Sequence, residues 1–284
     1  MHLPKDPGLY HQEWGKKEPI VLLLHGLNES SAGYRPSIKF LAPHLHIFAL
    51  DFRGHGHSPW LEPYKVRDYA TDVIHFLQSQ IKAPAILAGH SLGGLVAAHL
   101  ASQQIDLVAG LILEDPPLYT AQFPTIKETP FYEMFRDVRN LLQMHHDTAG
   151  TAQDMEAQVG QWRVGGEGSP SLEEIFGKAF VTRLAQELHL SDPRVLDPVL
   201  EGTLFEDFDP DQDLPKIACP TYLIAGNFEL GGALRRQDIE RVTSLIPDCS
   251  YVVWDNIGHD IHTLKPREYY DEVLSYIKVG PPAT

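Results

Sequence analysis

One pentapeptide constrains the fold of this chain more than any other feature, the G-x-S-x-G sequence GHSLG at residues 89–93. It directly follows the apolar run 85–89 and opens a stretch rich in small residues that fits a helix. A turn this tight between a strand and a helix strains the backbone of the serine and needs glycine on both sides for close packing. Ser91 is therefore expected at a sharp turn, with its hydroxyl exposed beside a helix N-terminus.

Short apolar runs alternate with longer amphipathic stretches along most of the 284 residues. This alternation predicts one main α/β domain, a parallel sheet with helices on both faces. The expected strands are Ile20–Leu24, Ile47–Asp51, Ala85–Gly89, Val108–Glu114, Thr221–Ala225 and Tyr251–Trp254. The expected helices are Tyr34–Leu41, Val66–Gln80, Leu92–Gln103, Arg235–Leu245 and Pro266–Ile277.

The alternation stops once, between about residues 118 and 213. Ser171 and Glu174 have the spacing of a capping box there. Apolar residues recur every three or four positions on one helix face at Phe176, Phe180, Leu184 and Leu188, and earlier at Phe131, Phe135, Val138 and Leu142. We expect a core of residues 1–117 and 214–284 and a helical insertion, 118–213, that caps the site; a plain packing subdomain is the alternative.

A serine hydroxyl needs a base placed to take its proton before it can act as a nucleophile. Where the order along the chain is serine, acid, histidine, the histidine lies in a loop beyond the final strands. His259 follows the run 251–254 and precedes the last helix, so it is the expected base. His262 competes with it, and is expected instead to support the loop or cap the next segment.

Two backbone N–H groups are expected to bind the negative charge that develops on a carbonyl oxygen under attack. One belongs to Leu92, at the positive end of its helix. The other belongs to Leu27, in the loop after the first strand, where Gly26 permits close approach. Gly26, His90 beside the nucleophile and Trp162 in the insertion are the predicted substrate-contacting residues.

Four segments together resemble the α/β-hydrolase superfamily: HGLN at 25–28, DFRGHGHS at 51–58, GHSLGG at 89–94 and GH at 258–259. The resemblance covers almost the whole chain outside the insertion. It implies the α/β-hydrolase fold, a mostly parallel, doubly wound sheet with an inserted helical cap. The set is similar to the esterase, lactonase and C–C hydrolase branch, in which the turn at 51–58 is structural.

Two features qualify this resemblance. Serine in place of aspartate at position 91 argues against haloalkane dehalogenase or epoxide hydrolase chemistry. Only 19 residues precede the first clear strand, so the leading hairpin is expected to be reduced.

Two carboxylates qualify as the acid that orients the histidine and stabilises its cation. In most of the superfamily the acid follows the strand that corresponds to 221–225, where Glu229 stands. In some members it follows the preceding strand, where Asp115 stands in an Asp-Pro turn that would fix a short carboxylate rigidly. We favour Asp115 and keep both. Glu114 is expected to point to the opposite face of its strand.

The charge balance bears on partners. Thirty-eight acidic residues against 23 basic ones give a net charge of −15, which opposes simple electrostatic binding to nucleic acid or anionic lipid. The apolar runs are far shorter than the roughly 20 residues of a membrane span, and the start lacks a secretory pattern. We expect no membrane association, a cytoplasmic location and a small-molecule partner. A surface patch cannot be seen in one sequence, so no oligomeric state is predicted.

No metal-ligand spacing and no nucleotide-binding glycine motif is found in the sequence, so neither a metal nor a cofactor is expected. The pattern predicts a serine hydrolase that cleaves a carboxylic ester or lactone of a small, uncharged, fairly apolar substrate through an acyl-enzyme on Ser91. C–C bond hydrolysis or perhydrolysis would use the same residues, and a ligand receptor with little turnover is the alternative of another class.

Overall fold

A computed structural model describes residues 7–163 and 168–279 of the chain. In the described residues, seven strands form one sheet in the order β1-β3-β2-β4-β5-β6-β7. Strands β2 to β7 run parallel, and β1 pairs antiparallel with β3 at the edge. The strands are β1 (His11–Trp14), β2 (Ile20–Leu24), β3 (His46–Leu50), β4 (Ala85–His90), β5 (Val108–Glu114), β6 (Thr221–Gly226) and β7 (Cys249–Trp254).

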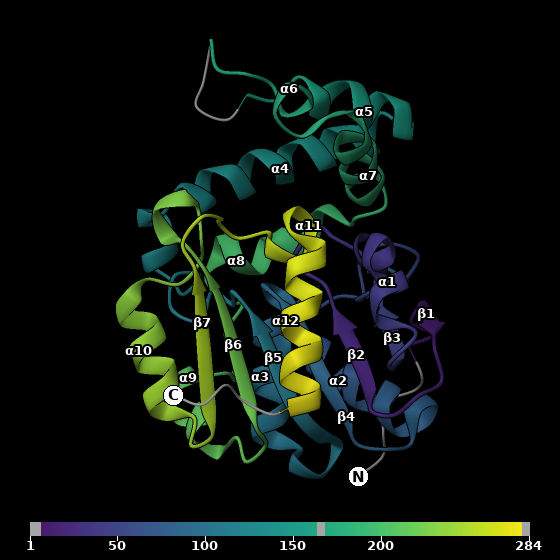
Figure 1. Ribbon diagram of the computed structural model, residues 1–284. Coiled ribbons are helices and arrows are strands. Elements are labelled where there is room, and N and C mark those ends of the chain that lie inside the picture. The colour runs from purple at the N-terminus through teal and green to yellow at the C-terminus, as the bar shows by residue number, and fades with distance from the viewer. Residues whose placement is uncertain (1–6, 164–167, 280–284) are drawn as a thin grey trace.

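Helices cover both faces of the sheet (Figure 1). On one face lie α1 (Arg35–Leu41), α11 (Ile261–Leu264) and α12 (Pro266–Val279), and on the other α2 (Val66–Phe76), α3 (Leu92–Gln103) and α10 (Arg236–Leu245). Each face has its own apolar cluster. All five residues of β2 are buried, because a central parallel strand is covered on both sides.

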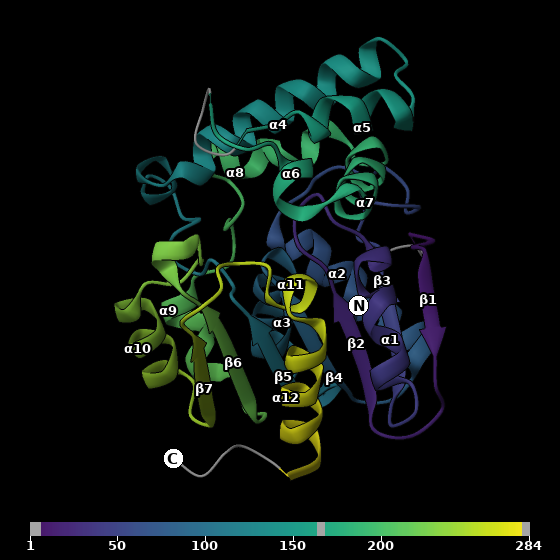
Figure 2. The same ribbon diagram turned by 45° about the horizontal axis from the view of Figure 1, so that its top comes forward.

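The segment between β5 and β6 is helical, as expected. Figures 1 and 2 show its helices α4 to α8 above the carboxyl ends of the parallel strands. The apolar stripe on α4 faces inward, with Val138 and Leu142 buried. The helices are α4 (Pro130–Asp147), α5 (Ala152–Gly160), α6 (Leu172–Phe176), α7 (Lys178–His189), α8 (Asp197–Glu201) and α9 (Pro210–Asp213).

The structure corrects one expected helix and adds one strand. The stripe from Phe176 to Leu188 is split between α6 and α7, because Gly177 has a φ of 82° and ends the first helix. The capping box of Ser171 and Glu174 is present at the start of α6. Strand β1 had no counterpart in the sequence analysis, since its residues HQEW form no apolar run. No helix in the described residues is long and apolar enough to cross a membrane.

Candidate active site

Ser91 joins β4 to α3 in the sharp turn that the sequence predicts. Its φ of 52° and ψ of −115° lie in a region that non-glycine residues rarely adopt. A Cβ atom at Gly89 would lie 2.3 Å from the carbonyl oxygen of Gly93, and one at Gly93 would lie 2.1 Å from that of Leu24. Strand, turn and helix therefore fit together only with glycine on both sides of the serine.

His259 and Asp115 lie side by side. The Nδ1 atom of His259 is 2.7 Å from Oδ2 of Asp115. Asp115 is fully buried at the end of β5, and its carboxylate also accepts hydrogen bonds from the N–H groups of Gly226 (3.2 Å) and Ala233 (2.7 Å). Because the carboxylate accepts, Nδ1 of His259 carries the hydrogen, and Nε2 is left to accept a proton. The carboxylate is thus held on three sides and fixes the histidine tautomer.

The competing residues lie elsewhere. Glu229 is exposed on the turn after β6, where its N–H donates to Oδ1 of Asn227. Glu114 points away from Asp115, and accepts hydrogen bonds from the backbone N–H (2.8 Å) and Nδ1 (3.0 Å) of His262. The structure brings Asp115, and not Glu229, to His259, and it places His262 as a support of the loop.

The two amides predicted to bind an oxyanion are available. Within the described residues, neither the Leu27 N–H nor the Leu92 N–H donates a hydrogen bond to a protein group. The N–H of Gly26, in contrast, is engaged, because it donates to Oε2 of Glu29 at 2.7 Å. Gly26 therefore shapes this loop, and its N–H is not open to a ligand.

The sequence analysis gave no role to Asn28 or Glu29. Asn28 has a φ of 61° and is 7% exposed, and its Nδ2 atom lacks a hydrogen-bond partner among the residues that the structure describes. A buried donor of this kind can be satisfied by a bound ligand. The sequence signal for both residues was only their place beside Gly26.

His90 packs behind His259. It is 1% exposed, its ring centroid is 4.6 Å from that of His259, and its Nε2 lies 3.2 Å from the His259 carbonyl oxygen. Its Nδ1 lies 3.2 Å from Glu29. Both ring nitrogens are thus bonded to protein groups, which favours a supporting role over direct contact with substrate.

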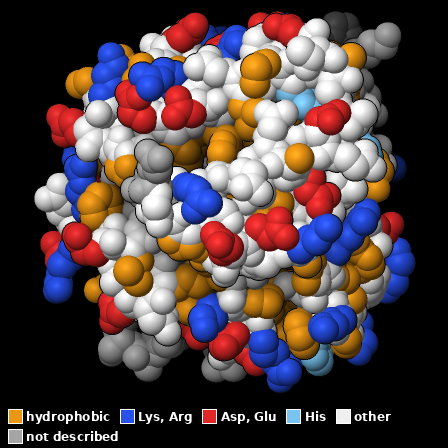
Figure 3. Space-filling view, turned by 90° about the horizontal axis from the view of Figure 1, so that it is seen from above, with side chains coloured by type: hydrophobic (Ala, Val, Ile, Leu, Met, Phe, Trp, Pro, Cys, Tyr) orange, Lys and Arg blue, Asp and Glu red, His pale blue; other side chains and the backbone are white. Residues whose placement is uncertain are grey.

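Trp162 lies in the turn after α5. Its backbone bonds to Val159 and Leu172, and its ring packs on the larger apolar cluster. Its place in a substrate pocket stays a prediction. Phe131 of α4 is better placed, since its ring centroid is 6.2 Å from that of His259 and it stacks on Phe135. Figure 3 shows hydrophobic side chains in a hollow of the face above the sheet.

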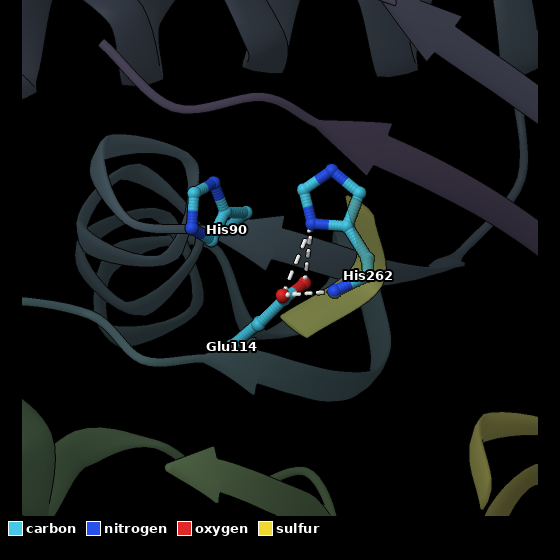
Figure 4. Close-up of side chains that lie close together, drawn as sticks. All are labelled: His90, Glu114 and His262. Carbon is cyan, nitrogen blue, oxygen red and sulfur yellow. Dashed lines mark hydrogen bonds and ion pairs between the residues drawn. The ribbon is translucent and has the colours of Figure 1, made fainter. Parts of the chain in front are cut away.

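Three buried side chains have the chemistry of metal ligands: His90, Glu114 and His262 (Figure 4). One ligand-type atom of each lies within 4.8 Å of the others. Each side chain has a protein partner, however, because Glu114 bonds to His262 and both nitrogens of His90 are engaged. The group is accounted for as a buried network of charges and hydrogen bonds.

The acidic and basic groups of this network shift one another's pKa values toward the charged forms. Burial lowers the pKa of His90, but the carboxylates of Glu29 and Glu114 outweigh it and raise that pKa to about 10. Burial raises the pKa of Glu29, but the charge of His90 and the N–H of Gly26 hold it well below its usual value. The pKa of Glu114 is also lowered, since His262 and His90 outweigh its burial.

The turn at residues 51–58 is structural, as the resemblance implied. The carboxylate of Asp51 accepts hydrogen bonds from the N–H groups of Ser31 (2.7 Å) and His57 (2.9 Å). Arg53 binds Asp72 of α2 through two hydrogen bonds of 2.6 Å. These contacts tie the end of β3 to the neighbouring loop and helix.

Known proteins show similarity along the chain. Lipase LipV of Mycobacterium tuberculosis is 38% identical over 109 residues, which make up 38% of this chain and 41% of that lipase. The sn-1-specific diacylglycerol lipase ABHD11 of Mus musculus is 25% identical over 270 residues, 91% of this chain and 81% of that lipase. The crystal structure of the enol-lactonase from Burkholderia xenovorans LB400 has a TM-score of 0.70 at 19% identity, and the match covers 95% of this chain and 96% of that enzyme.

The family assignment rests on a family model that matches most of the chain. The family model described as the alpha/beta hydrolase family matches residues 21–272, from the second strand of the sheet into the last helix. It includes the nucleophile turn, the Asp115 turn and the His259 loop. The chain belongs to the alpha/beta hydrolase family.

Proposed function

We propose that this protein is a serine hydrolase that cleaves a carboxylic ester or lactone of a small, uncharged, fairly apolar substrate. The observation that carries the proposal is the 2.7 Å contact between His259 Nδ1 and Asp115 Oδ2, in a chain whose Ser91 occupies a strained turn. A histidine oriented by a buried carboxylate is a base of fixed tautomer. A serine paired with such a base is a competent nucleophile.

Acylation follows from these roles. Ser91 Oγ attacks the substrate carbonyl carbon while its proton passes to His259 Nε2, and Asp115 stabilises the resulting imidazolium. The carbonyl oxygen becomes an oxyanion, which the N–H groups of Leu27 and Leu92 bind. The intermediate collapses as the C–O bond to the leaving group breaks, and His259 returns the proton to the departing alcohol oxygen.

Deacylation repeats the steps with water. His259 takes a proton from the water, whose oxygen attacks the acyl carbon, and the same two amides bind the second oxyanion. Ser91 Oγ then leaves with the proton held by His259, and the carboxylic acid is released. In a lactone the leaving alcohol remains attached to the acyl group, so ring opening gives a single hydroxy acid.

The substrate class is supported by the surroundings of His259. Phe131 and Phe135 supply apolar rings next to the base. Both belong to the insertion, residues 118–213, which we propose forms a cap over the site. The net charge of −15 disfavours anionic substrates. Three similar proteins are named as a lipase, a diacylglycerol lipase and an enol-lactonase, names that denote enzymes of ester-type bonds.

The test is hydrolysis of p-nitrophenyl esters from acetate to decanoate by the wild type and three variants. Ser91→Ala and Asp115→Asn are expected to lower kcat by about 10⁴-fold or more, the scale of such losses in triad enzymes. Glu229→Gln changes an exposed carboxylate that lies away from His259 and is the matched control, with kcat within about twofold of the wild type.

These measurements test the acid, the type of bond cleaved and the nucleophile separately. A large loss in Glu229→Gln with an active Asp115→Asn would reverse the choice of acid. If the wild type hydrolyses no ester or lactone but a fluorophosphonate labels Ser91, the nucleophile stands and the bond type is wrong. If Ser91 is neither labelled nor needed for turnover, the serine mechanism is refuted.

A further inference from the structure

Three parts of the candidate site meet at two side chains that the mechanism above does not use. They are the loop that bears the Leu27 amide, the turn that bears Ser91 and the loop that bears His259. Glu29 lies in the first loop, and His90 directly precedes Ser91. A link between them therefore connects the loop of the Leu27 amide to the turn of the nucleophile.

Glu29 fixes the conformation of its own loop. Its N–H donates to the carbonyl oxygen of Gly26 at 3.3 Å, and its Oε2 accepts the Gly26 N–H at 2.7 Å. These two contacts close a turn around Leu27. The packing is tight on one side, since a Cβ atom at Gly26 would lie 2.9 Å from Nδ1 of His90 and 3.0 Å from Cδ of Glu29.

Because Glu29 is ionised, the two contacts of His90 fit a positively charged ring. Its Nε2 faces the carbonyl oxygen of His259, which can only accept, so Nε2 carries a hydrogen. Its Nδ1 faces the carboxylate of Glu29, which also accepts, so Nδ1 carries a second hydrogen. An imidazole with hydrogens on both nitrogens is an imidazolium, and only this form makes both contacts.

We propose that Glu29 and His90 form a charged clamp that positions the Leu27 amide and the His259 loop around Ser91. The inference rests on the proposed function and deepens it, since both residues act through other groups and neither touches the reacting atoms. Misplacement of a catalytic group by about 1 Å can cost about 10²-fold in rate. Correct placement of these groups can therefore offset the cost of holding two charges away from water.

The surroundings of His90 include charges from several elements. The titratable groups around it are Glu29 and His25 on the loop after β2, Glu114 at the end of β5, His259 and Asp260 on the last loop, and His262 on α11. Glu114 is engaged with His262, which leaves Glu29 as the carboxylate that is hydrogen-bonded to His90. Removal of the Glu29 charge should therefore lower the pKa of His90.

The first test is Glu29→Gln, which keeps the side-chain size and an oxygen for the Gly26 N–H but removes the charge. For p-nitrophenyl esters we expect kcat per labelled active site to fall by about 10- to 100-fold, with KM within about twofold. The matched control is Asp213→Asn, which neutralises another buried carboxylate, 3.6 Å from His99 farther along α3 and hydrogen-bonded to Lys216 at 2.7 Å. Its kcat should be unchanged.

The pH profile separates positioning from a merely structural role. In the wild type His90 keeps both hydrogens up to a pH of about 10, so it adds no alkaline loss of kcat/KM below that value. In Glu29→Gln the pKa of His90 is lowered, because burial remains and the bonded charge is gone. A new alkaline limb should then appear below about pH 10. Glu29→Asp keeps the charge and should retain a flat profile, even where the shorter side chain lowers kcat.

A second measurement needs no substrate. Over a pH titration, the ¹⁵N chemical shifts of His90 should show that the wild type keeps hydrogens on both nitrogens up to about pH 10 and that Glu29→Gln loses one of them at a lower pH. A neutral His90 in the wild type overturns the clamp, whether or not the protein hydrolyses esters. Ser91-dependent turnover together with an unaltered kcat and pH profile in Glu29→Gln also overturns it, and leaves the proposed function standing.

Discussion

At the scale of single residues, the conformation of Ser91 depends on the absence of side chains at Gly89 and Gly93. Gly89 and Gly93 let the strand, the turn and the start of α3 approach within backbone contact. The strain at Ser91 is held by the surrounding packing, and this exposes the hydroxyl at the carboxyl end of β4.

Gly93→Ala should therefore damage both stability and activity. Its Cβ atom would lie 2.1 Å from the carbonyl oxygen of Leu24, so the backbone of β2 or α3 must shift. We expect a loss of at least about 1–3 kcal/mol in the free energy of unfolding, measured by urea titration, and a lower rate of labelling of Ser91. Gly110→Ala is the control, because its Cβ atom would lie 3.5 Å from the nearest atom. This substitution should change the free energy of unfolding by about 0.5 kcal/mol or less.

The nucleophile turn could be predicted because a short motif carries its whole geometry. For the acid, the sequence favoured Asp115 but left Glu229 open, because the two follow the neighbouring parallel strands β5 and β6, and both loops leave the same edge of the sheet. Only the N–H groups of Gly226 and Ala233 show which carboxylate is held beside His259. The contact between Glu29 and His90 joins residues 61 positions apart, so no local sequence pattern predicts it.

At the scale of elements, α7 of the insertion reaches the core through a buried carboxyl group. Oε1 of Glu187 accepts a hydrogen bond from Oγ of Ser30 at 3.2 Å, and Arg183 lies 3.7 Å from Glu187. Burial raises the pKa of Glu187 to about 8, against the opposing charge of Arg183. The insertion is thus attached to the loop beside the site through a group that titrates near neutrality.

This attachment predicts a pH dependence of stability. The pKa of Glu187 is about 8 in the folded chain and near its ordinary value of 4.5 when unfolded, so unfolding releases a proton between these values. The contribution of Glu187 to the free energy of unfolding should therefore fall as pH rises from about 4.5 to 8, and Glu187→Gln should remove that contribution from the wild-type curve. Urea titrations from about pH 5 to 9 measure it. His90, with its raised pKa, adds a fall in the same direction, whereas His25 and His55, whose pKa values burial lowers, oppose it below about pH 6.5, so the difference between variant and wild type isolates Glu187.

Glu229→Gln serves again as the exposed control and should keep the wild-type slope. An unchanged slope in Glu187→Gln would mean that Glu187 is ionised in the folded chain at low pH, and that it does not link α7 to the loop in the neutral form.

The elements that the sequence missed share a cause. Strand β1 pairs on one side only and carries polar residues, so it lacks the apolar run that marks a covered strand. The break at Gly177 was visible as a glycine, but the apolar spacing across it continued and favoured one helix. Periodicity predicted the type of structure in the insertion, and backbone conformation decided where it ends.

At the scale of the whole molecule, the net charge of −15 should act on substrates at a distance. We expect kcat/KM for an ester with an anionic acyl group to be lower than for its neutral isostere, and to rise as salt increases from about 10 to 300 mM, because salt screens the repulsion. The neutral ester is the internal control and should change little. A preference for the anionic ester at low salt would indicate a local cationic site and refute an uncharged substrate.

The neighbouring positions of β5 and β6 also bear on how such an enzyme can diversify. The chain leaves the sheet at Glu114 and returns at Thr221, and the two strands are hydrogen-bonded at the usual spacing of about 4.8 Å. The segment between them is therefore a crossover from the carboxyl end of β5 to the amino end of β6, where Thr221 pairs with Leu111. Because Ser91, Asp115 and His259 all lie outside the helices of this crossover, we expect that these helices can vary in sequence and length without changing the three residues, provided that contacts such as the one between Glu187 and Ser30 are kept.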